Sequence, residues 1–322
     1  MAAAGSHVAV VGAGSVGTTI AYACMLRGAA ARLSIYDIAA AKADAEVLDL
    51  RHGLEFVPSA SVDGGGDIEV CRGADVIVVT AGAKQKPGQS RLDLAATNAA
   101  ICRSMIPKLV EVAPEAVILL VTNPVDVLTS IAIEVAELPP GRVFGSGTVL
   151  DSSRLRVLLA HHCGVAVPNV HVHIVGEHGD SELALWSGAT LGGIAVHDWM
   201  SSDGTTVSNA LRDALVDDVR TSAQQIIAGK GATNWAVGLA ATRIIEAVLH
   251  DQHRVLPVSA PMDGYAGITG PICLSMPRIV GRAGAGAPLP TYIDAGERAA
   301  LVSSAKAVGG VLTSVGADRP SD

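Results

Sequence analysis

The fold is decided by residues 7–17, which read HVAVVGAGSVG. The apolar run that starts this stretch is typical of a buried strand, and helix-like sequence follows its last glycine. Gly12 permits a tight turn after the strand, Gly14 lets a pyrophosphate approach the backbone, and Gly17 lets the helix pack on the strand. The free N–H groups at the start of such a helix bind phosphate. The stretch therefore predicts a dinucleotide-binding turn.

An acidic residue ends the next predicted strand, which covers residues 32–36. Asp37 stands about 20 residues after Gly17, where such an acid accepts hydrogen bonds from both ribose hydroxyls and repels a 2′-phosphate. The predicted cofactor is therefore NAD and not NADP.

Two further apolar segments, 75–80 and 116–121, are typical of strands buried on both faces of a parallel sheet, and a helix is predicted between them over residues 92–112. In open α/β sheets ligands lie outside the carboxyl ends of the strands. Gly82 and Asn123, which follow these two strands, are therefore expected to meet the cofactor.

The alternation of strands and helices predicts an α/β protein. We expect a Rossmann doubly wound parallel sheet over residues 1–147, which binds NAD, followed by an α+β substrate-binding domain over residues 148–322. The glycine-rich run 63–67 is predicted to be a loop, and residues 170–174 are predicted to be a strand of the second half.

Composition excludes several classes of protein. The net charge of −8 is spread along the 322 residues without a basic block, which argues against nucleic acid as a partner. The cysteines are odd in number and contain no CxxC, so we expect reduced thiols in a cytoplasmic protein, with neither a disulfide framework nor a zinc site. Glycines interrupt the apolar run that starts at Val8, so no membrane segment is expected there.

Residues 81–91 form a predicted loop between a strand and a helix. Gly82, Pro87 and Gly88 offer hinge points, and the loop carries charge over the expected ligand site. One interpretation is a lid that closes over the ligand and delivers Arg91. The alternative is a solvated surface loop, and the loop by itself favours neither.

A candidate acid–base group lies in residues 170–182, VHVHIVGEHGDSE. Gly176 and Gly179 allow a tight turn around His178 at the end of a predicted strand. Because histidine changes charge near neutral pH, an uncrowded imidazole there suits proton transfer. An isolated His-Gly pair is more often a hydrogen-bonded turn residue, so the interpretation depends on partners elsewhere in the chain.

A predicted helix just after the domain boundary supplies such partners. Asp151 and Arg154 stand three residues apart and share one helix face, whereas Arg156 points to the opposite side. The alternative for Asp151 and Arg154 is a surface ion pair. His171 and His173 alternate onto one strand face, but no third ligand is spaced to complete a metal site, so no metal is expected.

Spaced motifs over residues 6–315 together resemble the lactate and malate dehydrogenase family, and they occur in the family's order. They are Gly12-x-Gly14-x-x-Gly17, Asp37, Ser90-Arg91-Leu92, Thr122-Asn123-Pro124, Asp151-x-x-Arg154, Gly176-Glu-His178-Gly-Asp and Lys230-Gly-Ala-Thr233. The resemblance implies an NAD-dependent dehydrogenase that transfers hydride to and from a small 2-hydroxy acid.

The resemblance also implies a role for each matched residue. His178 would exchange a proton with the substrate oxygen, and Asp151 would orient the imidazole and stabilise its charged form. Arg154 would bind the substrate carboxylate in a two-pronged pair, and Arg91 would polarise the substrate carbonyl from the lid. Further positions that would contact substrate or cofactor are Asn123, Thr233, Val16, Lys42, Gly82, Ala83, Ser104 and Ser146.

Gln85 is expected to decide which 2-hydroxy acid is used. Malate dehydrogenases that resemble this chain place an arginine at this loop position, where it meets the second carboxylate of oxaloacetate. A glutamine would leave that carboxylate desolvated and unpaired, which is costly, whereas pyruvate presents only a methyl group. Pyruvate and L-lactate are therefore the expected substrates. Lys84 and Lys86 keep oxaloacetate open as an alternative, because either side chain could reach the pocket.

Arg156 and His171 match positions at which bacterial family members that respond to fructose 1,6-bisphosphate carry arginine and histidine. The resemblance implies that paired subunits clamp the bisphosphate at an interface and form a homotetramer. The alternative is a pair of ordinary surface residues.

Other classes of protein fit less well. A short-chain dehydrogenase needs Tyr-x-x-x-Lys, and no tyrosine in this chain has lysine four residues later. A methyltransferase would leave Asp151, Arg154 and His178 unexplained. A catalytically silent NAD-binding protein on the same fold is the strongest alternative, although none of the expected catalytic positions is broken.

Overall fold

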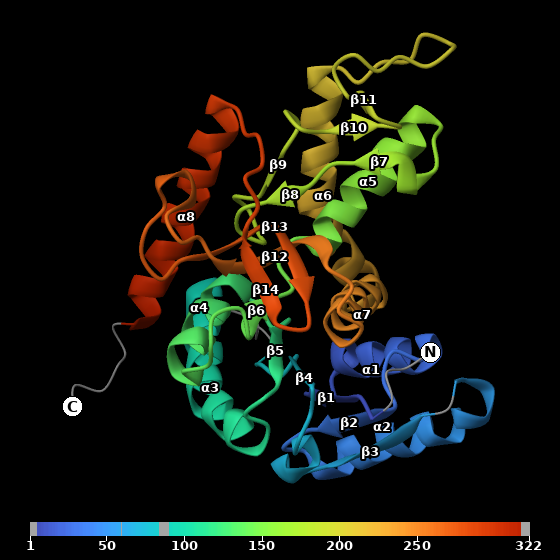
Figure 1. Ribbon diagram of the computed structural model, residues 1–322, viewed down its shortest axis with the longest axis vertical. Coiled ribbons are helices and arrows are strands. Elements are labelled where there is room, and N and C mark those ends of the chain that lie inside the picture. The colour runs from blue at the N-terminus through green and yellow to red at the C-terminus, as the bar shows by residue number, and fades with distance from the viewer. Residues whose placement is uncertain (1–4, 59, 84–89, 317–322) are drawn as a thin grey trace.

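The computed structural model of the protein describes residues 5–58, 60–83 and 90–316. Its largest sheet contains six parallel strands: β1 (His7–Val11), β2 (Arg32–Tyr36), β3 (Ser61–Gly65), β4 (Val76–Val79), β5 (Val117–Leu120) and β6 (Val143–Gly145). Three antiparallel strands extend it: β12 (Arg254–Pro261), β13 (Cys273–Gly281) and β14 (Gly284–Pro288). The order across the sheet is β14-β13-β12-β6-β5-β4-β1-β2-β3 (Figure 1).

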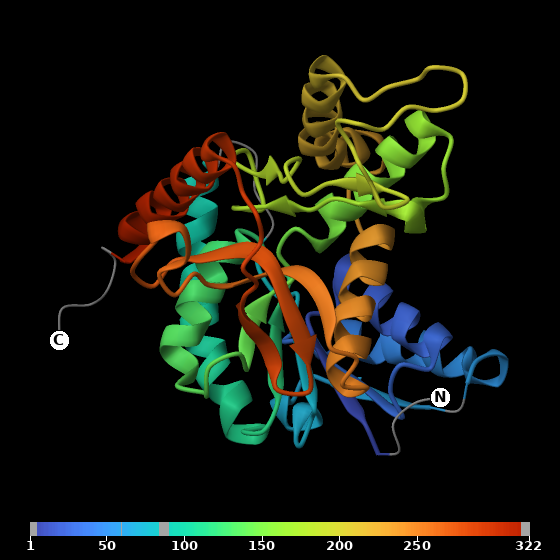
Figure 2. The ribbon, with the colours of Figure 1, turned by 45° about the horizontal axis from the view of Figure 1, so that its top comes forward.

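Helices cover both faces of this sheet (Figures 1 and 2). They are α1 (Ser15–Arg27), α2 (Ala40–His52), α3 (Arg91–Val112), α4 (Val125–Ala136), α7 (Trp235–Leu249) and α8 (Ala295–Gly316). Alternate side chains of β1 enter separate cores: Ala9 and Val11 pack with α3, α4 and α8, whereas Val8 and Val10 pack with α1, α2 and α7. The central strands are therefore apolar on both faces. The predicted Rossmann doubly wound sheet is confirmed.

The loop predicted for residues 63–67 is wrong in its first part, because β3 continues to Gly65 and pairs in parallel with β2 at the edge of the sheet. A Cβ atom on Gly64 would lie 2.2 Å from the carbonyl oxygen of Ile35. The glycine there is a packing requirement of a close strand pair, although a run of glycines in a sequence is also typical of a loop.

A second lobe contains α5 (Val149–Cys163), α6 (Asn209–Lys230) and five short strands around a third core (Figure 2). The strands are β7 (Val170–His171), β8 (Ile174–Val175), β9 (Leu183–Ala184), β10 (Thr190–Leu191) and β11 (Ile194–Ala195). The single strand expected over residues 170–174 is wrong, because β7 pairs with β10 and β8 pairs with β9. The break coincides with Val172, whose carbonyl accepts a hydrogen bond from Arg156 Nε at 2.9 Å.

Helix α8 is the one helix in the described ranges that is long and apolar enough, by length and composition, to cross a membrane. Its Leu301, Ala305 and Val308 lie in the core that contains α3 and α4. A core helix with one buried face passes the same test, and α8 packs in this way.

Candidate active site

A cavity of about 1070 Å³ opens where β1, β4 and β5 end, slightly larger than the range of about 300–1,000 Å³ for small-molecule sites. All of the predicted cofactor positions line it: Gly12, Gly14, Val16, Gly17, Asp37, Lys42, Gly82, Ala83, Ser104, Asn123 and Ser146. Arg154, His178 and Thr233 line it as well. Residues from both halves of the sequence therefore meet at one cavity.

The glycine-rich turn has the shape that a bound pyrophosphate requires. Gly12 has a φ angle of +109°, and a Cβ atom on Gly17 would lie 2.0 Å from the carbonyl oxygen of Gly12. A Cβ atom on Gly14 would meet nothing within 4 Å. Two of the glycines are thus required by the protein itself, and the third leaves open space at the start of α1. This arrangement fits a dinucleotide.

Asp37 lies at the carboxyl end of β2 and also braces the turn. One carboxylate oxygen accepts a hydrogen bond from the Ala13 N–H at 2.7 Å, and the other accepts one from the Ala39 N–H at 2.9 Å. A carboxylate offers about four acceptor positions, so both oxygens keep a lone pair for a ribose hydroxyl. The residues present fit NAD.

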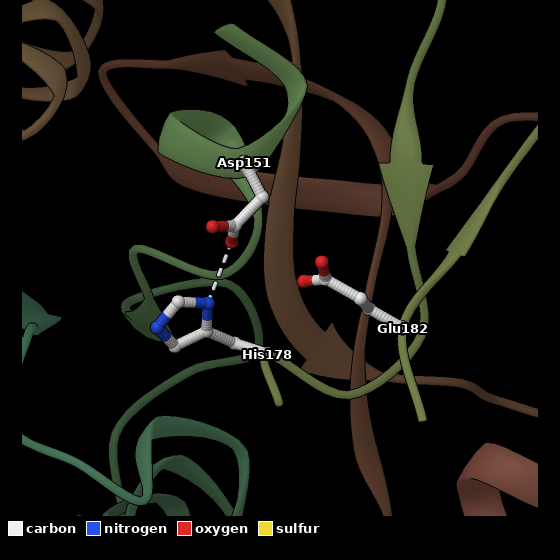
Figure 3. A group of neighbouring side chains, drawn as sticks. All are labelled: Asp151, His178 and Glu182. Carbon is white, nitrogen blue, oxygen red and sulfur yellow. Dashed lines mark hydrogen bonds and ion pairs between the residues drawn. The ribbon is translucent and has the colours of Figure 1, made fainter. Parts of the chain in front are cut away.

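His178 and Asp151 form a close pair, although they come from different elements (Figure 3). The Nδ1 atom of His178 lies 2.6 Å from Oδ2 of Asp151, and Asp151 is 2% exposed in the first turn of α5. The second carboxylate oxygen of Asp151 accepts a hydrogen bond from Arg154 at 2.6 Å. Because Nδ1 is engaged, Nε2 is the nitrogen of His178 that is left for a ligand in the cavity.

The pair is arranged to keep the imidazole protonated. Burial by itself lowers the pKa of His178, but the charge of Asp151 and its hydrogen bond, followed by the charges of Asp126 and Glu182, raise that pKa to about 9. Burial acts to raise the pKa of Asp151, yet His178 and then Arg154 hold it below its ordinary value. At neutral pH the site therefore contains an imidazolium beside a carboxylate.

Asp126 bonds to the main chain of His178, a role that the sequence motifs do not predict. Its Oδ2 accepts a hydrogen bond from the His178 N–H at 2.7 Å, and its Oδ1 accepts one from the Ser259 hydroxyl at 2.6 Å. Burial raises the pKa of Asp126 to about 6. The carboxylate thereby ties the histidine loop to α4 and β12. An acid in the first turn of a mostly apolar helix, directly after the Thr122-Asn123-Pro124 motif, was the available signal.

Glu182 is a second missed residue. It is 3% exposed, and side-chain atoms of Glu182, Asp151 and His178 lie within 4.8 Å of one another. Figure 3 shows its carboxyl group turned toward the Asp151–His178 pair. It stands four residues after the histidine, but nothing in the sequence indicates that the loop folds back on itself.

Asn98, on α3, joins the ends of two strands and was also missed. Its side-chain oxygen accepts a hydrogen bond from the Ala83 N–H at 2.7 Å, and its amide donates to the carbonyl oxygen of Asn123 at 2.9 Å. Asn98 is 3% exposed and lines the cavity. It therefore fixes the separation of the loops that follow β4 and β5.

Arg91 lies outside this cavity. It is the first residue of α3, and its guanidinium makes an exposed ion pair with Asp180 at 2.6 Å. Gln85, which is expected to decide substrate choice, lies outside the described residues, as do its neighbours Lys84 and Lys86.

Arg156 and His171 also lie away from the cavity. Arg156 donates a hydrogen bond to the carbonyl oxygen of Val172 and lies 3.1 Å from Nδ1 of His173, and His171 is exposed on β7. Burial, followed by the charge of Arg243, lowers the pKa of Arg156. Burial, followed by the charges of Arg156 and His171, lowers the pKa of His173 to about 4. Several basic groups are therefore gathered at this site.

Two protein-family models together match most of the chain. Residues 6–145 match the family model for the lactate/malate dehydrogenase NAD binding domain, and residues 148–314 match the model for the lactate/malate dehydrogenase alpha/beta C-terminal domain.

Individual relatives agree with the family models. The chain is 47% identical to an L-lactate dehydrogenase of Bifidobacterium animalis subsp. lactis, over 94% of both chains. It is 45% identical to one of Nitratidesulfovibrio vulgaris, over 94% of this chain and 98% of the relative. Among solved structures, a minor L-lactate dehydrogenase from Enterococcus mundtii superposes with a TM-score of 0.90 at 36% identity, covering 98% of this chain and 99% of that one. A lactate dehydrogenase from a Medee basin deep-sea metagenome library superposes with a TM-score of 0.92 at 34% identity, covering 97% and 99%.

Proposed function

The chain belongs to the lactate/malate dehydrogenase family, and we propose that it is an L-lactate dehydrogenase, which interconverts pyruvate and L-lactate with NAD as its cofactor. The observation that carries the proposal is the His178–Asp151 pair at 2.6 Å, on the wall of a cavity that also contains Arg154 and the glycine-rich turn. In this proposal residues 1–147 hold the cofactor, and residues 148–322 supply the groups that act on the substrate.

His178 is the proposed general acid and base. As pyruvate is reduced, negative charge builds on its C2 oxygen, and the Nε2–H of the imidazolium transfers a proton to that oxygen. Asp151 keeps the ring protonated and oriented beforehand, through the bond to Nδ1. Proton transfer by a positioned side chain typically contributes about 10²–10⁴-fold to the rate. In the reverse direction the neutral ring takes the hydroxyl proton of L-lactate.

Arg154 is the proposed ligand of the substrate carboxylate. Asp151 accepts a hydrogen bond from only one of its terminal nitrogens, at 2.6 Å, so other N–H groups of the guanidinium remain for a planar carboxylate. Asn123 and Thr233 line the same cavity, and we propose them as further substrate contacts. When bound, NADH supplies the hydride that reduces C2 of pyruvate, and NAD accepts it in the reverse direction.

Arg91 is proposed to enter the site when the loop at 81–91 closes. Its present partner, Asp180, lies two residues after His178, and both side chains of the ion pair are more than 70% exposed, at 72% and 78%. Exposed pairs contribute about 0–1 kcal/mol. Releasing Arg91 therefore costs little, and a guanidinium in the closed, drier site would polarise the substrate carbonyl.

Gln85 is proposed to select pyruvate over oxaloacetate, because a neutral side chain leaves a second substrate carboxylate unpaired. The relatives at 41–47% identity described as L-lactate dehydrogenases support this choice. The direct test is NADH oxidation with pyruvate, oxaloacetate and a branched 2-keto acid, compared side by side. We expect the highest kcat/KM with pyruvate. A preference for oxaloacetate would overturn the substrate assignment, and no turnover of any would favour a silent NAD-binding protein.

The variant Q85R sharpens this test. Arginine at position 85 would pair with the second carboxylate of oxaloacetate, and a buried charge-assisted pair is worth about 1.5–3 kcal/mol. The ratio of kcat/KM for oxaloacetate to that for pyruvate should therefore rise by at least about tenfold. An unchanged ratio would mean that another residue sets the specificity.

We further propose that the enzyme is a cytoplasmic homotetramer, activated by fructose 1,6-bisphosphate at Arg156 and His171. Support comes from the basic groups gathered around Arg156, whose mutual repulsion a bound phosphate would relieve. The five free cysteines are all buried, as suits a protein of a reducing compartment.

A further inference from the structure

Glu182 is a buried carboxyl group that the catalytic scheme above does not use. It is 3% exposed, and its Oε1 atom is buried without a hydrogen-bond partner. Its carboxyl group is directed at the Asp151–His178 pair (Figure 3). A charged carboxylate in such a position is costly unless cations or donors compensate it.

The charges that face Glu182 come from three elements. Asp151 and Arg154 belong to α5, His178 belongs to the same loop as Glu182, and Arg220 belongs to α6. Arg220 donates to the main-chain carbonyl of Glu182 at 2.6 Å and pairs with the exposed Asp217, so these two bonds do not reach the Glu182 carboxyl group. The charges of His178, Arg220 and Arg154 act to lower the pKa of that group, but burial and the charge of Asp151 outweigh them. Asp126, on α4, faces His178 from beyond the ring.

Two carboxyl groups beside one imidazole do not ionise independently. Asp151 holds its negative charge through direct bonds to His178 and Arg154. A second negative charge nearby is therefore disfavoured, in the way that two carboxylates sharing one site are. Burial, followed by the charge of Asp151, raises the pKa of Glu182 to about 8, so this carboxyl group is protonated at neutral pH.

We propose that Glu182 is a positioning residue of the proton-transfer site: its buried carboxyl group, directed at the Asp151–His178 pair, sets the upper pH limit to which His178 holds its proton. The inference rests on the proposed function. Glu182 is protonated at neutral pH, and once it is ionised its carboxylate lies close to the imidazolium and keeps the ring protonated at alkaline pH. Glu182 touches neither substrate nor cofactor in this role, and it acts through His178.

This role has opposite consequences for the two directions of the reaction. Reduction of pyruvate needs the protonated ring, so an ionised Glu182 extends that reaction to higher pH. Oxidation of L-lactate needs the neutral ring, so the same charge delays that reaction. Removing the ionisable group should therefore slow reduction and accelerate oxidation at alkaline pH, where Glu182 of the native enzyme is ionised, and should leave both directions nearly unchanged near neutral pH, where Glu182 is protonated. Structural damage would instead slow both directions.

The test compares the pH profiles of kcat/KM for pyruvate and for L-lactate in the native enzyme and in E182Q, which keeps the size and polarity of the side chain. We expect both profiles to move to lower pH by about one unit, the usual size of the effect of a close charge. Near neutral pH the pyruvate kcat should stay within about threefold of native, because glutamine mimics a protonated acid. E182D, which restores an ionisable group, should move the profiles back toward those of the native enzyme.

D217N is the matched control, because Asp217 is an exposed carboxylate on α6 that pairs with the same Arg220. Its profiles should coincide with the native ones. The inference is overturned if the E182Q profiles stay in place, if both directions slow without a shift, or if D217N shifts them equally. A native enzyme that turns over pyruvate while E182Q shows no shift contradicts only the role of Glu182. A native enzyme without turnover contradicts the proposed function and this role together.

Discussion

Three carboxyl groups surround the imidazole of His178, and each has a different environment. Asp151 bonds to the ring, Asp126 bonds to the main-chain N–H, and Glu182 is directed at the pair with an unpartnered oxygen. Asp126 therefore fixes the main chain of the histidine, and Asp151 orients the ring and keeps it protonated. The ionisation of Glu182 changes the charge beside the ring. A histidine on a flexible turn would have none of these constraints.

Glu182 also predicts how stability depends on pH. Its pKa is about 8 in the folded protein and has an ordinary value of 4.5. Between these values the folded state holds a proton that the unfolded state has lost, so this group lowers stability as the pH rises. E182Q has no such group, so its melting temperature should gain on the native value between about pH 5 and about pH 8. Thermal unfolding at both pH values checks this, and a difference that does not grow with pH would contradict it.

Among the individual site residues, the sequence predicts those that belong to a spaced motif. Asp151, Arg154 and His178 were expected together, and they meet within hydrogen-bonding distance. Asp126 and Glu182 were missed because their roles depend on tertiary contacts. Asp126 reaches a backbone 52 residues away in the sequence, and Glu182 requires a loop to fold back on itself.

The glycines in the turn between β1 and α1 are needed for two different reasons, packing within the protein and space for the cofactor. Gly17 is needed for packing, because an added Cβ atom would lie 2.0 Å from a backbone oxygen, whereas Gly14 has open space around it. We expect G14A to keep the melting temperature of the cofactor-free protein but to bind NADH at least about tenfold more weakly. We expect G17A to lower that melting temperature even without cofactor.

Thermal unfolding and NADH titration of the two variants check this separation. Equal losses of stability in both variants, or full NADH affinity in G14A, would be incompatible with the roles assigned to the two glycines.

At the scale of elements, the sequence predicts what is locally encoded. Apolar runs flanked by turn residues identified β1, β4 and β5, because strands buried on both faces need such runs. The sequence-based prediction was wrong at β3, where the glycines allow two strands to pair closely. It was also wrong at residues 170–174, where Arg156 donates a hydrogen bond to the carbonyl oxygen of Val172 and the expected strand is divided in two. Both errors arise from contacts that neighbouring residues do not encode.

The whole molecule places the site between its two halves. Strands β12, β13 and β14, from the second half of the sequence, extend the sheet of the first half, and α7 shares a core with α1. The cavity is accordingly lined from both sides, by Gly14 and Asp37 of one half and by Arg154 and His178 of the other.

The proposed effector site is tested on the whole assembly. If Arg156 binds a phosphate of fructose 1,6-bisphosphate, the effector should lower the KM for pyruvate several-fold in the native enzyme and not in R156Q. R72Q is the matched control, because Arg72 is exposed and pairs with Glu69 on the surface of the first half. Sedimentation with and without the effector should report tetramers. A pyruvate KM that ignores the effector at every pH would remove this regulatory proposal.

The central claim is that His178 donates the proton that pyruvate needs, and H178N tests it most directly. The measurement is the single-turnover rate at which enzyme-bound NADH is oxidised by pyruvate, with NADH affinity determined in the same preparation. We predict that the rate falls by about 10²–10⁴-fold while NADH binds as in the native enzyme, because the histidine lies apart from the glycine-rich turn. A near-native rate in H178N would contradict the account.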